Sequence, residues 1–249
     1  MPKQSVCWWC FEHLLRPQEL VLESARIGFL GIELVPEEHF GLVKAHGLEI
    51  ATHRGQTSIE RGWNDRANHA ELEQEFLQSL KMAQTWQIPT LIVFSGNRYG
   101  VLDTDGTQIA AEGLARVLGH AQDAGVTIAL ELLNSKIDHP HYMADQTAWG
   151  LELCQRLQSP NFGLLYDIYH MQIMEGDVLR TIQNLGSWFV HYHVAGNPGR
   201  HEPDATQELN YPAIAKALAG FDGFVGQEWQ PTGNPILGLE AAFKTFKPD

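Results

Sequence analysis

Four short apolar runs in the second half of the chain each end on a polar residue. The residues that end them are Glu131, Asp167, His193 and Glu228. Successive members are 36, 26 and 35 positions apart, and one strand–helix–strand unit takes roughly 30 residues or more. A short apolar run that ends on a polar residue is typical of a buried parallel strand leading into a loop. The spacing therefore predicts consecutive β/α units.

The same alternation of strand-like and helix-like segments extends over all 249 residues. Strands are predicted at 4–9, 31–35, 48–53, 89–94, 126–131, 161–167, 188–194 and 221–228. Helices are predicted at 17–27, 71–87, 109–124, 146–157, 177–185, 211–219 and 237–246, with a short helical segment after residue 36. Strict alternation predicts a parallel sheet, and eight units can close it into a barrel of about 250 residues. We therefore expect one α/β domain over residues 1–249, a single (β/α)8 TIM barrel.

An open, doubly wound parallel sheet is the alternative fold. Such a sheet typically carries a glycine-rich phosphate-binding turn near its N-terminus. The sequence has no turn of that kind there. The closed barrel is therefore the preferred prediction.

Composition and charge argue against several classes of partner. The formal net charge of −13 disfavours nucleic acid, which would need a basic face. No apolar run reaches the roughly 18 residues of a membrane span, and the first five residues do not begin a signal peptide. Cys7 and Cys10 have the spacing of redox and zinc motifs, but no second pair completes a zinc site, so buried or loop thiols are predicted. A cytoplasmic protein is expected, and a homo-oligomer is left open.

The four strand-end residues together have the character of a metal site. In a parallel barrel the C-terminal ends of the strands meet at one mouth, where these folds place their sites. Three carboxylates and one imidazole suit a divalent metal ion, with Mg²⁺ or Mn²⁺ favoured and Zn²⁺ or Co²⁺ as alternatives. Singly, Asp167 could cap a helix and His193 could be a core histidine. Glu131 and Glu228 could be solvated rim acids, although a carboxylate that ends an apolar strand is costly unless paired or coordinated.

Polar residues near other predicted strand ends are candidate substrate-binding groups. His170 lies one helical turn past Asp167 and is predicted to donate a hydrogen bond to substrate. Arg200, in the loop after the seventh strand, is a fixed cation suited to a carboxylate or a polarised oxygen. His53 and Asn97 follow other strands and have weaker claims.

His191 belongs to the same predicted strand as His193. The two-residue period of a strand places both on the same side, with His191 one layer deeper. We therefore predict a structural role for His191.

Three segments resemble the hydroxypyruvate isomerase family, namely Leu130–Ser135, Tyr166–Gln172 and Pro198–Pro203. The resemblance also takes in shorter motifs at 60–62, 96–98, 210–212 and 226–229. That family belongs to the xylose-isomerase-like barrels, whose relatives include sugar epimerases and a DNA-repair endonuclease. Two positions depart from its pattern. His193 stands where many members carry glutamine, which suggests stronger metal binding, and Lys136 stands where arginine is usual.

The resemblance implies an aldose–ketose type isomerase that acts on a small 2-oxo or hydroxy acid, in the first place hydroxypyruvate to tartronate semialdehyde. It also implies that Glu131 and Glu228 form the acid/base pair. The residues themselves support similar chemistry, because carboxylates beside a bound cation can move a proton through an enediolate. Alternatives are a 2-oxo-tetronate isomerase, a ketose 3-epimerase, a metal-dependent endonuclease-like hydrolase and a non-catalytic sugar-acid binding protein. Aromatic residues that could wall the site are Trp8, Trp9, Phe11 and Trp229.

Overall fold

The computed structural model describes residues 2–247. Within this range, eight parallel strands close into a barrel in chain order. The strands are β1 (Lys3–Cys7), β2 (Gly31–Glu33), β3 (Glu49–Arg54), β4 (Thr90–Val93), β5 (Thr127–Glu131), β6 (Phe162–Asp167), β7 (Phe189–Val194) and β8 (Phe224–Gln227). The predicted (β/α)8 TIM barrel is confirmed. That residues 1–249 form a single domain stays a prediction.

Helices alternate with the strands, as expected. The α-helices of the described residues are α1 (Pro17–Ile27), α2 (Phe40–Ala45), α3 (His69–Trp86), α4 (Asp103–Ala124), α5 (Thr147–Leu157), α6 (Ile168–Met174), α7 (Val178–Leu185), α8 (Tyr211–Ala217) and α9 (Pro235–Thr245). Single 3₁₀ turns are η1 (Trp8–Cys10), η2 (Glu37–His39), η3 (Arg66–Asn68) and η4 (Gly186–Trp188). Among these residues no helix has the length and apolar character needed to cross a bilayer.

The predicted boundaries differ from the structure in two places that bear on the site. Strand β1 ends at Cys7, two residues earlier than expected, because residues 8–10 turn into η1. Helix α6 is absent from the predicted elements, since its seven residues are too few to show a helical apolar period. It begins directly after Asp167, whose side chain caps it.

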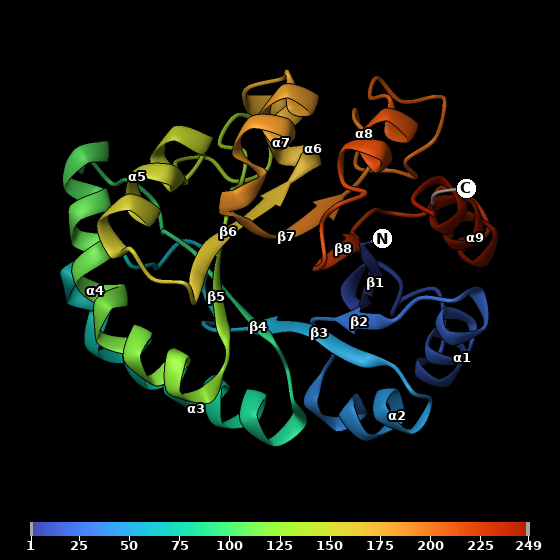
Figure 1. Ribbon diagram of the computed structural model, residues 1–249, viewed down its shortest axis with the longest axis horizontal. Coiled ribbons are helices and arrows are strands. Elements are labelled where there is room, and N and C mark those ends of the chain that lie inside the picture. Colours follow the sequence, from blue (N-terminus) through green and yellow to red (C-terminus); the bar gives the residue numbers. More distant parts are fainter. Residues whose placement is uncertain (1, 248–249) are drawn as a thin grey trace. The chain divides into compact units, whose positions relative to one another are not determined.

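The described chain divides into two compact units. The first comprises residues 2–51, 177–186 and 191–247. In it β1 pairs with both β2 and β8, and β8 pairs with β7. Helices α1 and α9 pack side by side (Figure 1).

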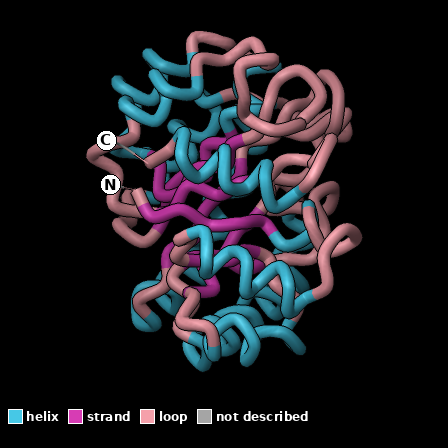
Figure 2. Tube along the Cα trace, turned by 90° about the vertical axis from the view of Figure 1, so that its right-hand side faces the viewer, coloured by secondary structure: helices cyan, strands magenta, loops and turns pink. Residues whose placement is uncertain are grey.

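The second unit comprises residues 52–176 and 187–190. Strands β3, β4, β5 and β6 pair in that order. Helix α4 packs between α3 and α5, and these helices lie outside the strands (Figure 1). In the view of Figure 2, helices in cyan likewise lie around strands in magenta. All six residues of β6 are buried, which is typical of a parallel strand covered on both faces.

The four polar residues that the sequence places at strand ends do lie there. Glu131 ends β5 and Asp167 ends β6. His193 is the last residue but one of β7, and Glu228 directly follows β8. Each unit therefore presents two of the predicted metal ligands at the C-terminal ends of its strands.

Candidate active site

His193 lies between two acidic side chains in the first unit. Its Nδ1 is 3.0 Å from Glu228 Oε2, and its Nε2 is 2.9 Å from Glu33 Oε2. Burial alone would lower the pKa of His193, but Glu228, Cys7 and Glu33 outweigh it and hold that pKa well above its ordinary value. Cys7 Sγ lies 3.8 Å from the same Nε2. The imidazole is thus held from both of its nitrogens.

Glu228 is held at both carboxylate oxygens. Trp9 Nε1 donates to Oε1 at 3.0 Å, and Arg200 Nη2 donates to Oε2 at 2.5 Å. The guanidinium carbon of Arg200 also lies 5.3 Å from the centre of the Trp9 ring, a cation–π distance. Arg200, predicted to bind substrate, therefore rests against the predicted catalytic carboxylate.

The backbone of the loop after β7 explains how Arg200 reaches Glu228. Arg200 adopts a left-handed conformation with φ of 57°, and its carbonyl accepts a hydrogen bond from Gln230 N at 2.7 Å. Glu202 accepts from both the amide and the hydroxyl of Thr232, each at 2.9 Å. The loop after β7 is therefore attached to the segment after β8.

Two of the four aromatic residues named from the sequence pack together at the ends of β1 and β8. Phe11 meets Trp229 edge to face, with ring centres 5.0 Å apart. Trp8 stacks on His39, whereas Trp9 is half-buried and points its indole N–H at Glu228. Trp9 is thus the member of the set that contacts a candidate catalytic group.

The second unit holds Asp167 and His170. Asp167 Oδ1 accepts from the amides of Tyr169 and His170, at 2.8 and 3.3 Å, so Asp167 does cap α6. Its Oδ2 lies 3.5 Å from His170 Nε2. The amide of Asn134 donates to His170 Nδ1 at 3.1 Å. Because Nδ1 accepts, the imidazole proton belongs on Nε2, which makes His170 a hydrogen-bond donor.

Glu131 ends β5 with only 5% of its surface exposed. Its carbonyl accepts a hydrogen bond from the Tyr142 hydroxyl at 2.8 Å. Lys136 lies a short distance along the following loop and donates to the carbonyls of Ile173 and Met174, at 2.9 and 3.0 Å. Those carbonyls end α6, so Lys136 caps the C-terminus of that helix.

The two weaker substrate-binding candidates also belong to the second unit. His53 lies on β3 and is buried, and this burial, with a smaller effect of Arg54, lowers the pKa of His53 to about 4. Asn97 is half-buried in the loop after β4 and donates to the Tyr99 hydroxyl at 3.2 Å. His53 is therefore neutral at pH 7.

Glu33 is a site residue that the sequence reasoning misses. It ends β2, is completely buried and accepts hydrogen bonds from Ser5 and from both histidines of β7. Burial raises the pKa of Glu33, but His191 and His193 outweigh this and hold it well below its ordinary value. The sequence signal is weak, because Leu34 and Val35 continue the apolar run and the predicted strand 31–35 places Glu33 inside it and not at its end.

Buried groups of the first unit offer atoms of metal-ligand type. Glu33, His191 and His193 form one such group, and Cys7, His193 and Glu228 form another; within each group the atoms lie within 4.8 Å of one another. Cys7 and Cys10 are buried free thiols, as predicted, and Cys154 is a buried free thiol as well. Buried His and Glu side chains of this chain can therefore hold a metal ion.

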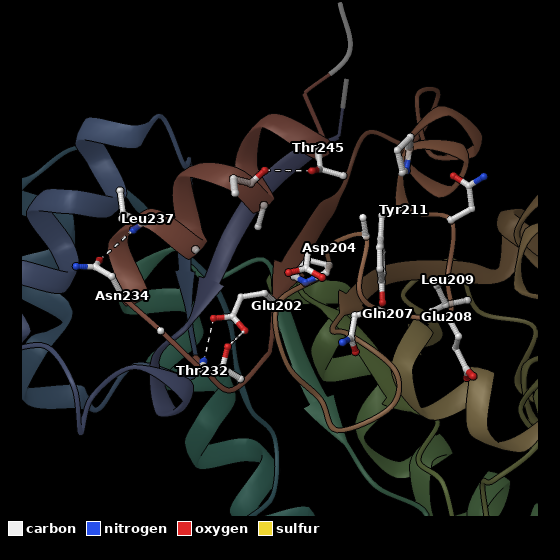
Figure 3. A pocket seen from close by; sticks show the side chains of 18 residues that line it. Glu202, Asp204, Gln207, Glu208, Leu209, Tyr211, Thr232, Asn234, Leu237 and Thr245 are labelled. Atoms are coloured by element: carbon white, nitrogen blue, oxygen red, sulfur yellow. Dashed lines mark hydrogen bonds between the residues drawn. The ribbon is translucent and has the colours of Figure 1, made fainter.

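A cavity of about 830 Å³ lies elsewhere in the first unit, between the loop after β7 and helix α9 (Figure 3). Its lining includes Glu202, Thr232 and Asn234, which Figure 3 shows engaged with neighbouring groups. None of the described residues that line it is a predicted metal or catalytic residue. The predicted metal and catalytic residues therefore lie outside the lining of this cavity.

Comparison with known proteins agrees with the fold. The family described as xylose isomerase-like TIM barrel matches residues 21–248. Among solved structures, that of an AP endonuclease, family 2, from Brucella melitensis is 28% identical with a TM-score of 0.89, and the match covers 100% of both chains.

Curated relatives carry isomerase names. The chain is 35% identical over 130 residues to a 2-oxo-tetronate isomerase from Cupriavidus necator, a match that covers 51% of this chain and 49% of that protein. It is also 35% identical over 130 residues to a putative hydroxypyruvate isomerase from Homo sapiens, covering 51% and 47%. The chain thus spans about half the length of the curated relatives it matches.

Proposed function

The chain belongs to the xylose isomerase-like TIM barrel family, and from this premise we propose that it is an isomerase of a small 2-oxo or hydroxy acid. The first candidate reaction is hydroxypyruvate to tartronate semialdehyde. One observation carries the proposal: Glu228 is a carboxylate only 4% exposed, at the end of a barrel strand, with a cation and two ring N–H groups around it. A buried carboxylate of this kind is suited to exchange a proton with a substrate acid that is bound next to it.

We propose that Glu131, Asp167, His193 and Glu228 hold one divalent cation. Their side chains are 0–5% exposed, and buried carboxylates favour coordination. They lie at the C-terminal ends of β5 to β8, which are consecutive in the barrel order. Mg²⁺ or Mn²⁺ suits a donor set rich in carboxylates, with Zn²⁺ or Co²⁺ as alternatives. When bound, the cation supplies positive charge that stabilises an oxyanion on the substrate.

The residues of the chain would then divide the work as follows. Glu131 and Glu228 remove the proton beside the carbonyl and return it to the neighbouring carbon. Arg200 binds the substrate carboxylate, and His170 donates its Nε2 proton to a substrate oxygen. Neutral His53 and the amide of Asn97 are weaker candidates for further substrate contacts.

A four-carbon acid is the second candidate substrate, because a relative that is 35% identical is named 2-oxo-tetronate isomerase. A ketose 3-epimerase would use the same proton transfer. The partner is in each case a small molecule. An endonuclease-like hydrolase is disfavoured, because that chemistry needs a cluster of metals with several histidines, whereas β4 leads into Ser95-Gly96-Asn97 and the net charge is −13.

A proton-exchange screen tests the proposed function. Protein supplied with Mg²⁺ or Mn²⁺ is incubated in deuterated water with hydroxypyruvate and other small hydroxy-oxo acids, and the substrates are analysed by NMR. Deuterium at the carbon beside the carbonyl reports enolisation even where the product is unknown. We expect exchange and about one divalent ion per chain by elemental analysis. Two or three tightly bound zinc ions would point to the hydrolase, and metal binding without any exchange would point to a binding protein.

A further inference from the structure

Glu33 is a completely buried carboxylate that the proposed reaction does not use. We infer that Glu33 is a positioning residue: it takes the Nε2 proton of His193 in a hydrogen bond and so turns Nδ1 of that ring toward the cation. The inference rests on the proposed function, because it concerns the ligand nitrogen of His193. Under this inference Glu33 acts on the metal ion through the side chain of His193 and not by direct coordination.

The two nitrogens of His193 face different carboxylates. Nε2 is 2.9 Å from Glu33 Oε2, and Nδ1 is 3.0 Å from Glu228 Oε2. A carboxylate held by hydrogen bonds accepts and does not donate, so the proton between His193 and Glu33 belongs to Nε2. In the metal-free chain Nδ1 donates to Glu228 in the same way, but Glu228 is itself a proposed metal ligand, so a cation would displace that proton and make Nδ1 the ligand nitrogen. Metal-ligating histidines commonly donate their other N–H to a carboxylate in this way.

The neighbours of Glu33 keep its carboxylate in one position. Ser5 Oγ donates to Oε1, and His191 Nε2 lies 3.1 and 3.0 Å from Oε1 and Oε2. Together with His193, these two residues make three side chains that donate to the carboxylate of Glu33. Neither carboxylate oxygen is left to act as a base toward substrate. Under this inference His191 keeps the structural role predicted for it.

Small residues on the intervening strands let Glu33 reach β7. Glu33 lies on β2, and β1 and β8 separate that strand from β7 in the barrel order. Ser5 of β1 is paired with Gly226 of β8, and Gly226 is paired with His193. A Cβ at Gly226 would overlap Glu33 Oε1 and lie 2.8 Å from His193 Cδ2. The path from Glu33 to His193 therefore depends on a glycine at this position.

A metal ion held by Glu33, His191 and His193 themselves is the competing interpretation, because their ligand atoms lie within 4.8 Å of one another. The direct contacts of 2.9–3.1 Å between the two histidines and Glu33 fit hydrogen bonds. The Ser5 hydroxyl also donates to the same carboxylate. Hydrogen bonding therefore accounts for these contacts without a second ion, and the number of bound ions distinguishes the two interpretations.

The test is titration of the metal-free full chain with Mn²⁺ by calorimetry, comparing the parent with Glu33→Gln and His191→Gln. Glutamine at 33 keeps the shape, but its amide N–H can donate to Nε2 and force the imidazole proton onto Nδ1, the ligand nitrogen. We expect Glu33→Gln to weaken Mn²⁺ binding by about 10- to 100-fold. His191→Gln keeps a donor toward Glu33 and should bind Mn²⁺ within about threefold of the parent. Thermal unfolding of the metal-free forms shows whether both variants are folded.

Each outcome decides the inference. A folded Glu33→Gln that binds Mn²⁺ as tightly as the parent refutes it and leaves the proposed function standing. Two ions in the parent and one in Glu33→Gln refute it in favour of a second metal site. A parent that binds no divalent ion refutes the metal-assisted reaction and the inference together. Should Glu33→Gln not fold, ¹⁵N NMR of the Zn²⁺-loaded parent decides, because a protonated Nε2 in His193 supports the inference and a metal-bound Nε2 overturns it.

Discussion

Glu228 has both carboxylate oxygens engaged, by Trp9 on one side and by Arg200 and His193 on the other. To exchange a proton with substrate, it must release at least one of these partners. Arg200 is the partner best placed to leave, because it comes from a loop and its side chain is 16% exposed. A substrate carboxylate would give the guanidinium a new anion and free Glu228 at the same time.

Replacing Arg200 by alanine should therefore raise KM for a carboxylate substrate more than it lowers kcat. A charge-assisted contact acts in the ground state and the transition state alike, and its loss should raise KM by about tenfold or more. Lysine at 200 should recover part of the loss, since it keeps the charge without the planar fork. Steady-state kinetics measures both constants, with Arg26→Ala, an exposed ion-paired arginine, as control. Unchanged constants in Arg200→Ala would make Arg200 a surface residue.

Glu131→Gln and Glu228→Gln should each lower kcat by about 10²- to 10⁴-fold, because glutamine keeps the size and removes the base. If the two act as a unit, the double variant should be little worse than the worse single one. Metal content is measured in every variant, and activity is compared at saturating metal. Glu49→Gln, which removes a partly exposed carboxylate on β3, is the control.

Deuterium exchange separates the two roles. The variant that lacks the abstracting base should stop exchange into substrate, whereas the other can still exchange without forming product. Near-full turnover in both variants with metal bound would place the acid/base work elsewhere, with His170 as the next candidate.

Strand β8 bears on the candidate site in two ways. Glu228 follows its last residue, and Gly226 leaves the space through which Glu33 contacts His193. Glycine is required at 226 because the side chains of Glu33 and His193 occupy the space that a Cβ would fill, and not because of the backbone conformation. The strand therefore tolerates very little change at this position.

Gly226→Ala should destabilise the protein by about 1–3 kcal/mol, the usual cost of forcing extra atoms into a packed core. Gly119→Ala is the matched control, because a Cβ at Gly119 on α4 meets no atom within 4 Å. Alanine in a helix is favoured over glycine, so Gly119→Ala should stabilise by up to about 1 kcal/mol. Urea unfolding of both variants measures the difference. A Gly226→Ala protein as stable as the parent would show that Glu33 and His193 can move apart freely.

The free energy of unfolding should depend on pH through His53. Burial, with Arg54 as the smaller cause, lowers its pKa to about 4 in the folded chain, against about 6.5 in an unfolded one. The unfolded chain thus binds the proton more readily, so stability falls as pH drops from about 6.5 to about 4 and levels off below. The loss is on the order of 3 kcal/mol. Urea unfolding of His53→Asn should show a flatter profile over this range, while His120→Asn, at an exposed position, should follow the parent.

Much of the barrel follows from local sequence. Alternating apolar runs and helical periods predict the eight strands, and four of those runs place Glu131, Asp167, His193 and Glu228 at their ends. This works because strand and helix formation depend on nearby residues, and because sequential β/α units pair in order. Short elements such as α6 were missed, since seven residues carry too little periodicity.

The contacts among the candidate site residues were decided only by the tertiary structure. Glu33 meets His193 from 160 positions away, on a strand that is not its neighbour, and Arg200 meets Glu228 because the loop after β7 is attached to the segment after β8. The periodicity of the sequence does not predict which side chains of non-adjacent strands contact one another inside a closed barrel. That depends on register, on the small residues Ser5 and Gly226, and on closure itself. Local sequence determines which side chains lie at the strand ends, whereas tertiary packing determines which of these side chains form hydrogen bonds with one another.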